Sequence, residues 1–234
     1  MKIDIITLFP DMFTGPFDAS IIKRAKERGL VEINIHNLRN WTKDKHKTVD
    51  DRPYGGGAGM LLKVEPIDRA LDALKRKTKS EERKIILLDP GGKKYDQVAA
   101  EKLSRLDNLI LICGHYEGVD HRIREHLIDE ELSVGDYILT GGEIPAMVIV
   151  DTVTRLIPGV LEKVEATQSE SFSSLSTNHP SPTTLLEHPQ YTRPENFKGW
   201  KVPQVLLSGN HKEIEKWKKT QAMQRTKNNR PDLL

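Results

Sequence analysis

Runs rich in isoleucine, leucine and valine alternate with helical patterns over the first 160 or so residues. Several runs are too continuously apolar for a half-exposed antiparallel sheet and are typical of strands buried on both faces. The runs are KIDIITLF, VEINIHNL, RKIILLDP, NLILICGHY and SVGDYILTG. Apolar spacing of three and four residues predicts helices at IIKRAKERG, VEPIDRALDALKRK, YDQVAAEKLSRL and IPAMVIVDTVTRLI. Because strands and helices alternate, the sequence predicts an α/β domain with a largely parallel sheet.

The last of these helical patterns is apolar on nearly every side from Ile144 until Thr154 and Arg155. A lone surface helix has a polar face, which this segment lacks. The pattern therefore predicts either a core helix or a helix at a subunit interface.

The character of the chain changes after residue 161. Residues 162–184 are polar and rich in serine and threonine, as linkers are. Residues 185–234 end in the basic helical pattern KEIEKWKKTQAMQRTKNN. We therefore expect an α/β domain over 1–161, a flexible linker over 162–184 and a small helical domain over 185–234.

The charge is balanced overall but uneven along the chain. Of 234 residues 30% are charged and the net charge is +2, yet Lys23–Arg52 and Glu195–Leu234 are both basic. Two basic regions indicate a polyanionic partner, although ordinary solvated faces explain the charge equally well. No apolar run is long enough for a membrane span and no signal-peptide pattern is present, so we expect a cytoplasmic protein.

A single cysteine, Cys113, lies within the run LILICG. One cysteine excludes an intramolecular disulfide and a cysteine-rich zinc site. A small buried strand residue is the favoured interpretation of Cys113 over a nucleophile. The histidines at 115, 121 and 126 match no paired-ligand spacing, so no metal site is predicted from them.

Three glycine-bearing loops follow predicted strands in the α/β domain. In open α/β sheets ligands bind at the carboxyl ends of strands, where glycine lets main-chain groups approach a ligand. None of the loops is a P-loop or a GxGxxG fingerprint, and together they favour a pocket built mostly from main chain. The loops are LLDPGGKK at 87–94, CGHYEGVD at 113–120 and SVGDYILTGGEIP at 133–145. A fourth segment, YGGGAGM at 54–60, follows a charged run and also needs a reason to lack side chains.

These loops belong to a longer series of motifs. In order they are TVDDRPYGGGAGM, ICGHYEGVDHRI, EELSVGDYILTGGEIPAM, RLIPGVL, HPQYTRP and VPQVLLSGNH. The series closely resembles the bacterial tRNA (guanine-N1)-methyltransferases that modify guanosine 37 beside the anticodon, over almost the entire chain. The resemblance implies a SPOUT-class domain with a deep trefoil knot, an exception to ordinary chain connections. It also implies an obligate homodimer that holds S-adenosylmethionine in the knot, with each site completed by the partner's C-terminal domain.

The same resemblance assigns the cofactor pocket. Apolar side chains and main-chain groups suit adenine, and Glu117 suits the cationic or hydroxyl part of the ligand. The expected cofactor-binding residues are Leu87, Leu88, Asp89, Pro90, Gly114, Tyr116, Glu117, Gly118, Val134, Gly135, Tyr137, Ile138, Leu139, Gly141, Gly142 and Pro145. The resemblance further suggests that Mg²⁺ assists catalysis, although no carboxylate cluster in the sequence indicates a site.

The reaction requires a base for the N1 proton of guanine and a cation for charge developing on O6. By resemblance the cation is Arg155 and the base is Glu170, with Glu165 or a displaced alignment as the alternative. The family usually has aspartate where this chain has Glu170, which changes reach rather than basicity. The segment between SF and YTRP is also longer than the family form, which leaves the linker boundaries open.

The side-chain-free backbone of the glycine segment can pass close to RNA or to the cofactor-binding loops, and its charged neighbours are the expected RNA side of the site. The candidates are Lys43, His46, Asp50, Arg52, Gly55, Gly56, Gly57, Ser169 and His211, with the basic helix from Lys212 to Arg230. Two other functions stay open at this point. One is a non-catalytic RNA-binding dimer that keeps the cofactor pocket, and the other is a SPOUT methyltransferase acting at another RNA position.

Overall fold

A computed structural model of the chain describes residues 1–77, 82–162, 170–172 and 184–234. The chain divides into two units, Met1–Glu162 and Lys163–Leu234. Most of the expected linker, at 163–169 and 173–183, lies outside the described residues.

The first unit is built on a parallel sheet. Its strands, in spatial order, are β2 (Glu32–Asn37), β1 (Lys2–Thr7), β6 (Asn108–Cys113), β5 (Arg83–Lys94) and β7 (Glu130–Ser133). Each neighbouring pair in this order is parallel. The predicted α/β class with a largely parallel sheet is confirmed, whereas the knot stays a prediction.

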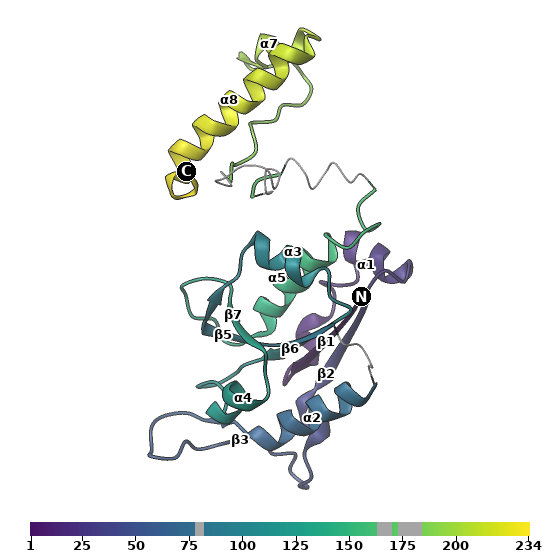
Figure 1. The fold of residues 1–234 in the computed structure, drawn as a ribbon, viewed down its shortest axis with the longest axis vertical. Coiled ribbons are helices and arrows are strands. Elements are labelled where there is room, and N and C mark those ends of the chain that lie inside the picture. The colour runs from purple at the N-terminus through teal and green to yellow at the C-terminus, as the bar shows by residue number, and fades with distance from the viewer. Residues whose placement is uncertain (78–81, 163–169, 173–183) are drawn as a thin grey trace. The chain divides into compact units, whose positions relative to one another are not determined.

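Helices cover both faces of this sheet (Figure 1). One face carries α1 (Ser20–Glu27), α3 (Gln97–Leu103) and α5 (Glu143–Thr154), and the other carries α2 (Val64–Lys77) and α4 (His121–His126). Side chains of β6 alternate between the two cores: Leu109 and Leu111 pack on the α5 side, and Ile110 and Ile112 on the α2 side. Burial on both faces explains why β6 is apolar at every position from Leu109 to Cys113.

Helix α5 is a core helix along most of its surface. Ala146, Ile149, Val150 and Val153 are fully buried against the sheet. On the remaining side Ile144 is 47% and Val148 is 40% exposed. The prediction of a core helix is therefore confirmed. The exposed apolar residues keep open the alternative prediction of a helix at a subunit interface.

The third glycine loop was expected to continue a strand through residue 141, and this expectation is wrong. Strand β7 ends at Ser133, and residues 134–141 form no strand. The chain folds back at Gly135, because the Tyr137 ring occupies the space of a Gly135 side chain and the Tyr137 N–H donates to the Gly135 carbonyl at 2.9 Å. Extended pairing is impossible through such a turn.

The first glycine loop, at 87–94, was expected to follow a strand but is itself part of one, because β5 continues through it to Lys94. Leu132 of β7 pairs first with Leu88 and then with Lys93, so the residues between them bulge. Gly92 allows this close passage, since a Cβ there would lie 2.5 Å from the Leu132 nitrogen.

Two short strands close the segment that contains YGGGAGM. Strand β3 (Asp50–Asp51) pairs antiparallel with β4 (Leu61–Leu62), and the Lys63 N–H donates to the Val49 carbonyl at 2.8 Å. Two 3-10 helices, η1 (Pro10–Phe13) and η2 (Leu38–Trp41), follow β1 and β2. The glycine segment is therefore a long loop with a fixed base.

The second unit holds the predicted basic helix as α8 (His211–Asn229). Before it come the hairpin of β8 (Asn196–Phe197) and β9 (Trp200–Lys201), and helix α7 (Gln204–Leu207), and η3 (Pro231–Leu233) follows it. Thr226 of α8 is fully buried, and its hydroxyl accepts from the Leu186 N–H at 2.9 Å. In the described ranges, no helix is both long enough and apolar enough to cross a membrane.

Candidate cofactor pocket and its surroundings

A pocket of about 240 Å³ lies at the carboxyl ends of β6, β5 and β7. Three chain segments line it: Leu88–Pro90, Gly114–Gly118 and the stretch from Leu132 to Pro145. This is where open parallel sheets bind their ligands. The mixture of apolar side chains and glycine main chain suits a ligand with a flat apolar part and a few polar edges.

The expected cofactor-binding residues line this pocket, with the exception of Leu87. Leu87 is fully buried and packs on the α2 side of the sheet, because neighbouring strand residues face opposite ways and Leu88 faces the pocket side. Four further residues line the pocket without having been predicted: His115, Leu132, Ser133 and Thr140. His115, Ser133 and Thr140 lie within loops that had been singled out, and Leu132 directly precedes the third loop, so proximity in the sequence was the available signal.

Glycine allows the second and third loops to pack backbone against backbone. The Gly142 N–H donates to the Gly114 carbonyl at 2.8 Å, and His115 and Gly141 form an antiparallel bridge. A Cβ on Gly142 would lie 2.6 Å from the Cys113 Cα, which no side-chain rotation could relieve. The pocket wall therefore depends on the absence of a side chain at 142.

Cys113 itself is buried at the end of β6, as predicted. Burial, with the nearby Glu143 carboxylate, raises the pKa of the Cys113 thiol. A protonated, buried thiol is a poor nucleophile.

Tyr116 has a strained backbone within the pocket wall. Its φ of +57° is in the left-handed region, which a bulky residue seldom adopts. Its ring contacts the His115 ring edge-on, with the centroids 4.8 Å apart. Strain held by surrounding structure is common at binding sites, so Tyr116 is a candidate ligand contact.

An ion pair fixes the first loop. Arg124 of α4 donates to Asp89 Oδ2 at 2.6 Å and also bonds Glu131 at the end of β7. Burial acts to lower the pKa of Arg124, but its hydrogen bond to Asp89 and the charges of Asp89 and Glu131 outweigh this and raise it. The paired carboxylate of Asp89 also accepts from the Gly91 N–H at 2.9 Å. The sequence patterns did not predict α4, which supplies this arginine.

The glycine segment meets the second pocket loop directly. The Glu117 N–H donates to the Met60 carbonyl, and the Leu62 N–H donates to the Gly118 carbonyl, both at 3.0 Å. A Cβ on Gly59 would lie 2.3 Å from Glu117 Cγ. Gly59 also has a φ of +82°, so the backbone conformation and the nearby Glu117 side chain together favour glycine at this position.

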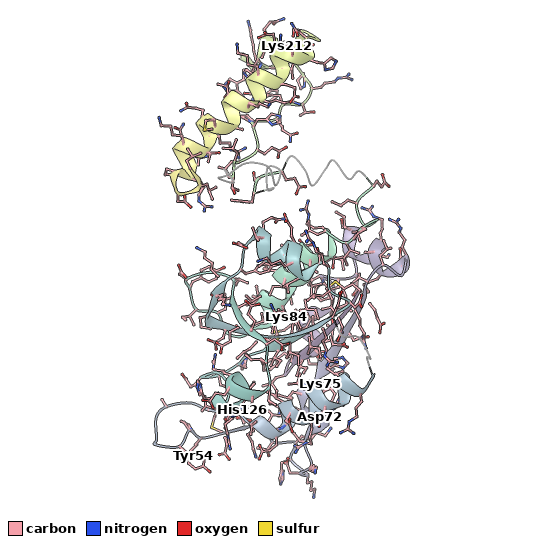
Figure 2. All side chains as sticks on the ribbon, in the orientation of Figure 1. Tyr54, Asp72, Lys75, Lys84, His126 and Lys212 are labelled. Carbon is pink, nitrogen blue, oxygen red and sulfur yellow. The ribbon has the colours of Figure 1, made fainter. Side chains whose placement is uncertain are left out.

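The RNA-side candidates of the first unit surround the same segment. Lys43, His46, Arg52 and Gly55–Gly57 are exposed, and Asp50 begins β3. Figure 2 shows Tyr54 on the loop that projects from the first unit, and its side chain is fully exposed. His211 is exposed at the first position of α8, in the second unit, and Ser169 lies outside the described residues.

The two candidate catalytic residues belong to different units. Arg155 caps the C-terminus of α5, and its N–H donates to the Asp151 carbonyl at 3.2 Å. Glu170 precedes Ser171, whose hydroxyl accepts from the Glu187 N–H at 2.9 Å. The Phe172 N–H donates to the Leu185 carbonyl at 3.3 Å. These bonds attach residues 170–172 to the segment leading into α8, whereas the alternative base, Glu165, lies outside the described residues.

No group of three or more histidine, cysteine, aspartate or glutamate side chains is arranged to hold a metal ion within the described ranges. The magnesium that the resemblance implies therefore has no evident ligand set there.

Comparison with known proteins bears on the whole chain. The family model described as tRNA (Guanine-1)-methyltransferase TrmD matches residues 1–234. Relatives named tRNA (guanine-N(1)-)-methyltransferase include that of Dictyoglomus turgidum, 53% identical over all of this chain and 90% of the relative. Those of Geobacter sp. strain M21 and Halalkalibacterium halodurans are 54% and 53% identical over all of this chain and 90% and 91% of their own lengths. The chain thus belongs to the tRNA (guanine-1)-methyltransferase TrmD family, a family of the SPOUT class.

Proposed function

We propose that this chain transfers a methyl group from S-adenosylmethionine to N1 of guanosine 37 in tRNA, next to the anticodon. The observation that carries the proposal is the pocket at the ends of β6, β5 and β7, lined by the residues expected for the cofactor. Membership of a family of tRNA (guanine-1)-methyltransferases supports the reaction type. A tRNA substrate implies a cytoplasmic reaction.

The residues present fit the methyl donor. Leu88, Val134, Ile138 and Leu139 offer apolar walls for adenine, and the glycines of the loops expose main-chain groups for its polar edges. Glu117 offers a carboxylate to the ammonium or hydroxyl groups of the ligand. When bound, S-adenosylmethionine supplies an electrophilic methyl group on sulfur.

Glu170 and Arg155 are the proposed catalytic pair. Guanine N1 carries a proton and its lone pair is conjugated, so a base has to remove that proton as N1 attacks. Glu170 accepts the proton, and the Arg155 guanidinium stabilises the negative charge that develops on O6. The side chain of glutamate has nearly the pKa of aspartate and one methylene more. Its backbone can therefore lie one carbon farther from guanine N1 than the backbone of an aspartate would.

The RNA surface is proposed to combine the projecting loop with α8. Exposed Lys43, His46 and Arg52 can meet phosphates of the anticodon arm, and exposed Gly55–Gly57 let the backbone approach a base. Helix α8 adds a series of lysines from Lys212 onward, and Figure 2 shows Lys212 near the start of that helix. Phosphate contacts of this kind make binding depend on salt.

We further propose a homodimer in which the second unit of one protomer completes the site of its partner. Exposed apolar side chains at Ile144 and Val148 of α5 are suited to burial between subunits. The same helix carries Arg155 at its C-terminus. A dimer built on α5 would therefore bring Arg155 close to the contact between protomers.

The test is methyl transfer from labelled S-adenosylmethionine to two tRNA transcripts that differ only in guanosine or adenosine at position 37. Transfer to the first transcript alone supports the proposal. Equal transfer to both would indicate a different target in the RNA. Binding of both ligands without transfer to either would indicate a non-catalytic RNA-binding dimer.

A further inference from the structure

A buried carboxylate with no role in the reaction above lies behind the pocket wall. Glu143, in the first turn of α5, is only 1% exposed. Its Oε1 accepts from the Thr7 hydroxyl at 2.7 Å, although the two residues are 136 positions apart in the sequence. Thr7 Oγ1 in turn accepts from the Phe9 N–H at 2.9 Å. The helix N-terminus favours a negative charge at this position.

The other carboxylate oxygen faces an imidazole. Glu143 Oε2 lies 4.0 Å from His115 Nδ1, which is too long for a hydrogen bond. Within the part of the chain that the structure describes, His115 Nδ1 is buried and has no hydrogen-bond partner. His115 also lines the pocket. A buried nitrogen without a partner is unfavourable, so these two groups gain if they come closer together.

Gly141 keeps the space beside these two groups free of a side chain. A Cβ on Gly141 would lie 2.3 Å from Glu143 Oε2 and 2.6 Å from His115 Nδ1. The His115 ring is held between the rings of Phe9 and Tyr116, each with its centroid 4.8 Å away. Phe9, Thr7, Glu143 and His115 therefore form a closed ring of contacts that joins the end of β1 to the second and third pocket loops.

We propose that Glu143 and His115 are a positioning pair for the methyl donor, whose hydrogen bond forms when the pocket fills. His115 Nδ1–H then donates to Glu143 Oε2, and the second and third loops close on the ligand. The bond exists in the occupied state and not in the empty one, so its free energy adds to the affinity for the ligand. With its proton on Nδ1, His115 keeps Nε2 as a hydrogen-bond acceptor. This inference rests on the proposed binding of S-adenosylmethionine.

Two substitutions of His115 separate hydrogen bonding from packing. His115→Asn keeps a nitrogen donor near the position of Nδ1 and loses most of the ring. His115→Phe keeps a ring against Phe9 and Tyr116 and loses both nitrogens. The measurement is the affinity of the full chain for S-adenosylmethionine by titration calorimetry, with melting temperature and circular dichroism as checks on folding.

The proposed pairing predicts that the affinity of His115→Asn for S-adenosylmethionine is within about threefold of the wild-type affinity. The affinity of His115→Phe is expected to be lower by about tenfold or more. If the ring acts only by packing, the order is reversed. The reversed order, or equal affinities of the two variants, overturns the pairing. Failure of the wild-type chain to bind S-adenosylmethionine would instead overturn the proposed function, and the pairing with it.

A spectroscopic readout tests the same pair without relying on affinity. In long-range ¹H–¹⁵N spectra of the ligand-bound wild type, the His115 proton is expected on Nδ1. Glu143→Gln keeps an acceptor for Thr7 and turns an amide N–H toward His115, so the proton should move to Nε2. An Nε2 proton in the wild type, or the same tautomer in both proteins, overturns the proposal.

Discussion

At the scale of single residues, the pocket depends on glycines, because the lack of a side chain lets two loops pack backbone against backbone. Gly142→Ala is predicted to abolish S-adenosylmethionine binding, because the new Cβ would lie 2.6 Å from the Cys113 Cα and 2.9 Å from the Gly114 nitrogen. Both are backbone atoms, so one of the two loops has to move. Titration calorimetry measures the loss.

The matched control is Gly91→Ala. There the nearest atom is Asp89 Oδ1, a side-chain oxygen at 3.2 Å, and the Gly91 N–H is kept in alanine. Near wild-type affinity is expected for this variant. Equal affinities for Gly142→Ala and the wild type would show that the two loops are not packed as described.

The proposed base is tested by Glu170→Gln. Removing general-base catalysis is expected to lower the single-turnover rate of methyl transfer about 10²- to 10⁴-fold, with tRNA affinity unchanged. Glu170→Asp should retain much of the rate, because a carboxylate remains.

Full methyl transfer by Glu170→Gln would exclude Glu170 as the base and direct attention to Glu165. In the same assay Arg155→Ala should lose rate rather than affinity alone. A loss confined to tRNA affinity would contradict the charge role of Arg155.

At the scale of elements, the apolar runs predicted the strands most clearly where burial on both faces requires continuous apolar sequence, as in β6. The same criterion failed at SVGDYILTG, since Ile138 and Leu139 are apolar because they line a pocket and not because they pair in a sheet. Helix α4 is only six residues long, too short for a periodic pattern to be recognised. An apolar run can therefore mark the wall of a pocket as well as a buried strand.

A polar cluster crosses three strands of the otherwise apolar sheet. Asp4 of β1 is 1% exposed, and it accepts from His36 Nε2 at 2.8 Å and from Asn108 Nδ2 at 3.2 Å. Burial acts to raise the pKa of Asp4, but the hydrogen bonds from His36 and Asn108 and the charge of Lys2 outweigh it and lower the pKa below 3.8.

Because the folded-state pKa of Asp4 is lowered, its contribution to the free energy of unfolding is present above the ordinary pKa of 3.8. The contribution is lost as the pH falls through the folded-state pKa. Asp4→Asn is therefore predicted to lower the free energy of unfolding by about 1–3 kcal/mol at pH 7 and by progressively less below pH 4. Urea denaturation of both proteins at several pH values measures the difference.

Asp72→Asn is the control for this pH series. Asp72 lies on α2, where Figure 2 shows it with Lys75, and its exposed pair with Arg76 is 3.6 Å long. Exposed pairs of this kind contribute less than about 1 kcal/mol. If Asp4→Asn were no more destabilising than Asp72→Asn at pH 7, the polar cluster would not support the sheet.

At the scale of the whole molecule, the contacts that complete the site join residues far apart in the sequence. The bond from Thr7 to Glu143 and the ion pair from Arg124 to Asp89 had no local pattern to reveal them. The cofactor loops could be predicted because each is a continuous motif. Their supports could not, because they depend on which strands become neighbours in the sheet.

The proposed homodimer is tested through the apolar side of α5. Val148→Glu is predicted to shift the chain from dimer to monomer and to abolish methyl transfer, because it would bury an unpaired carboxylate between subunits. Analytical ultracentrifugation measures the oligomeric state. The control, Lys75→Glu, adds negative charge on α2, on the opposite face of the sheet, as Figures 1 and 2 show. A Val148→Glu chain that remained dimeric and active would contradict a dimer built on α5.

Identification of the methylated nucleoside and of its position tests the proposed methyl transfer. A tRNA transcript is incubated with the chain and S-adenosylmethionine, digested, and analysed by mass spectrometry against authentic standards. We predict 1-methylguanosine at position 37 and nowhere else. A methyl group on another atom of guanine, or at another position of the tRNA, would contradict it.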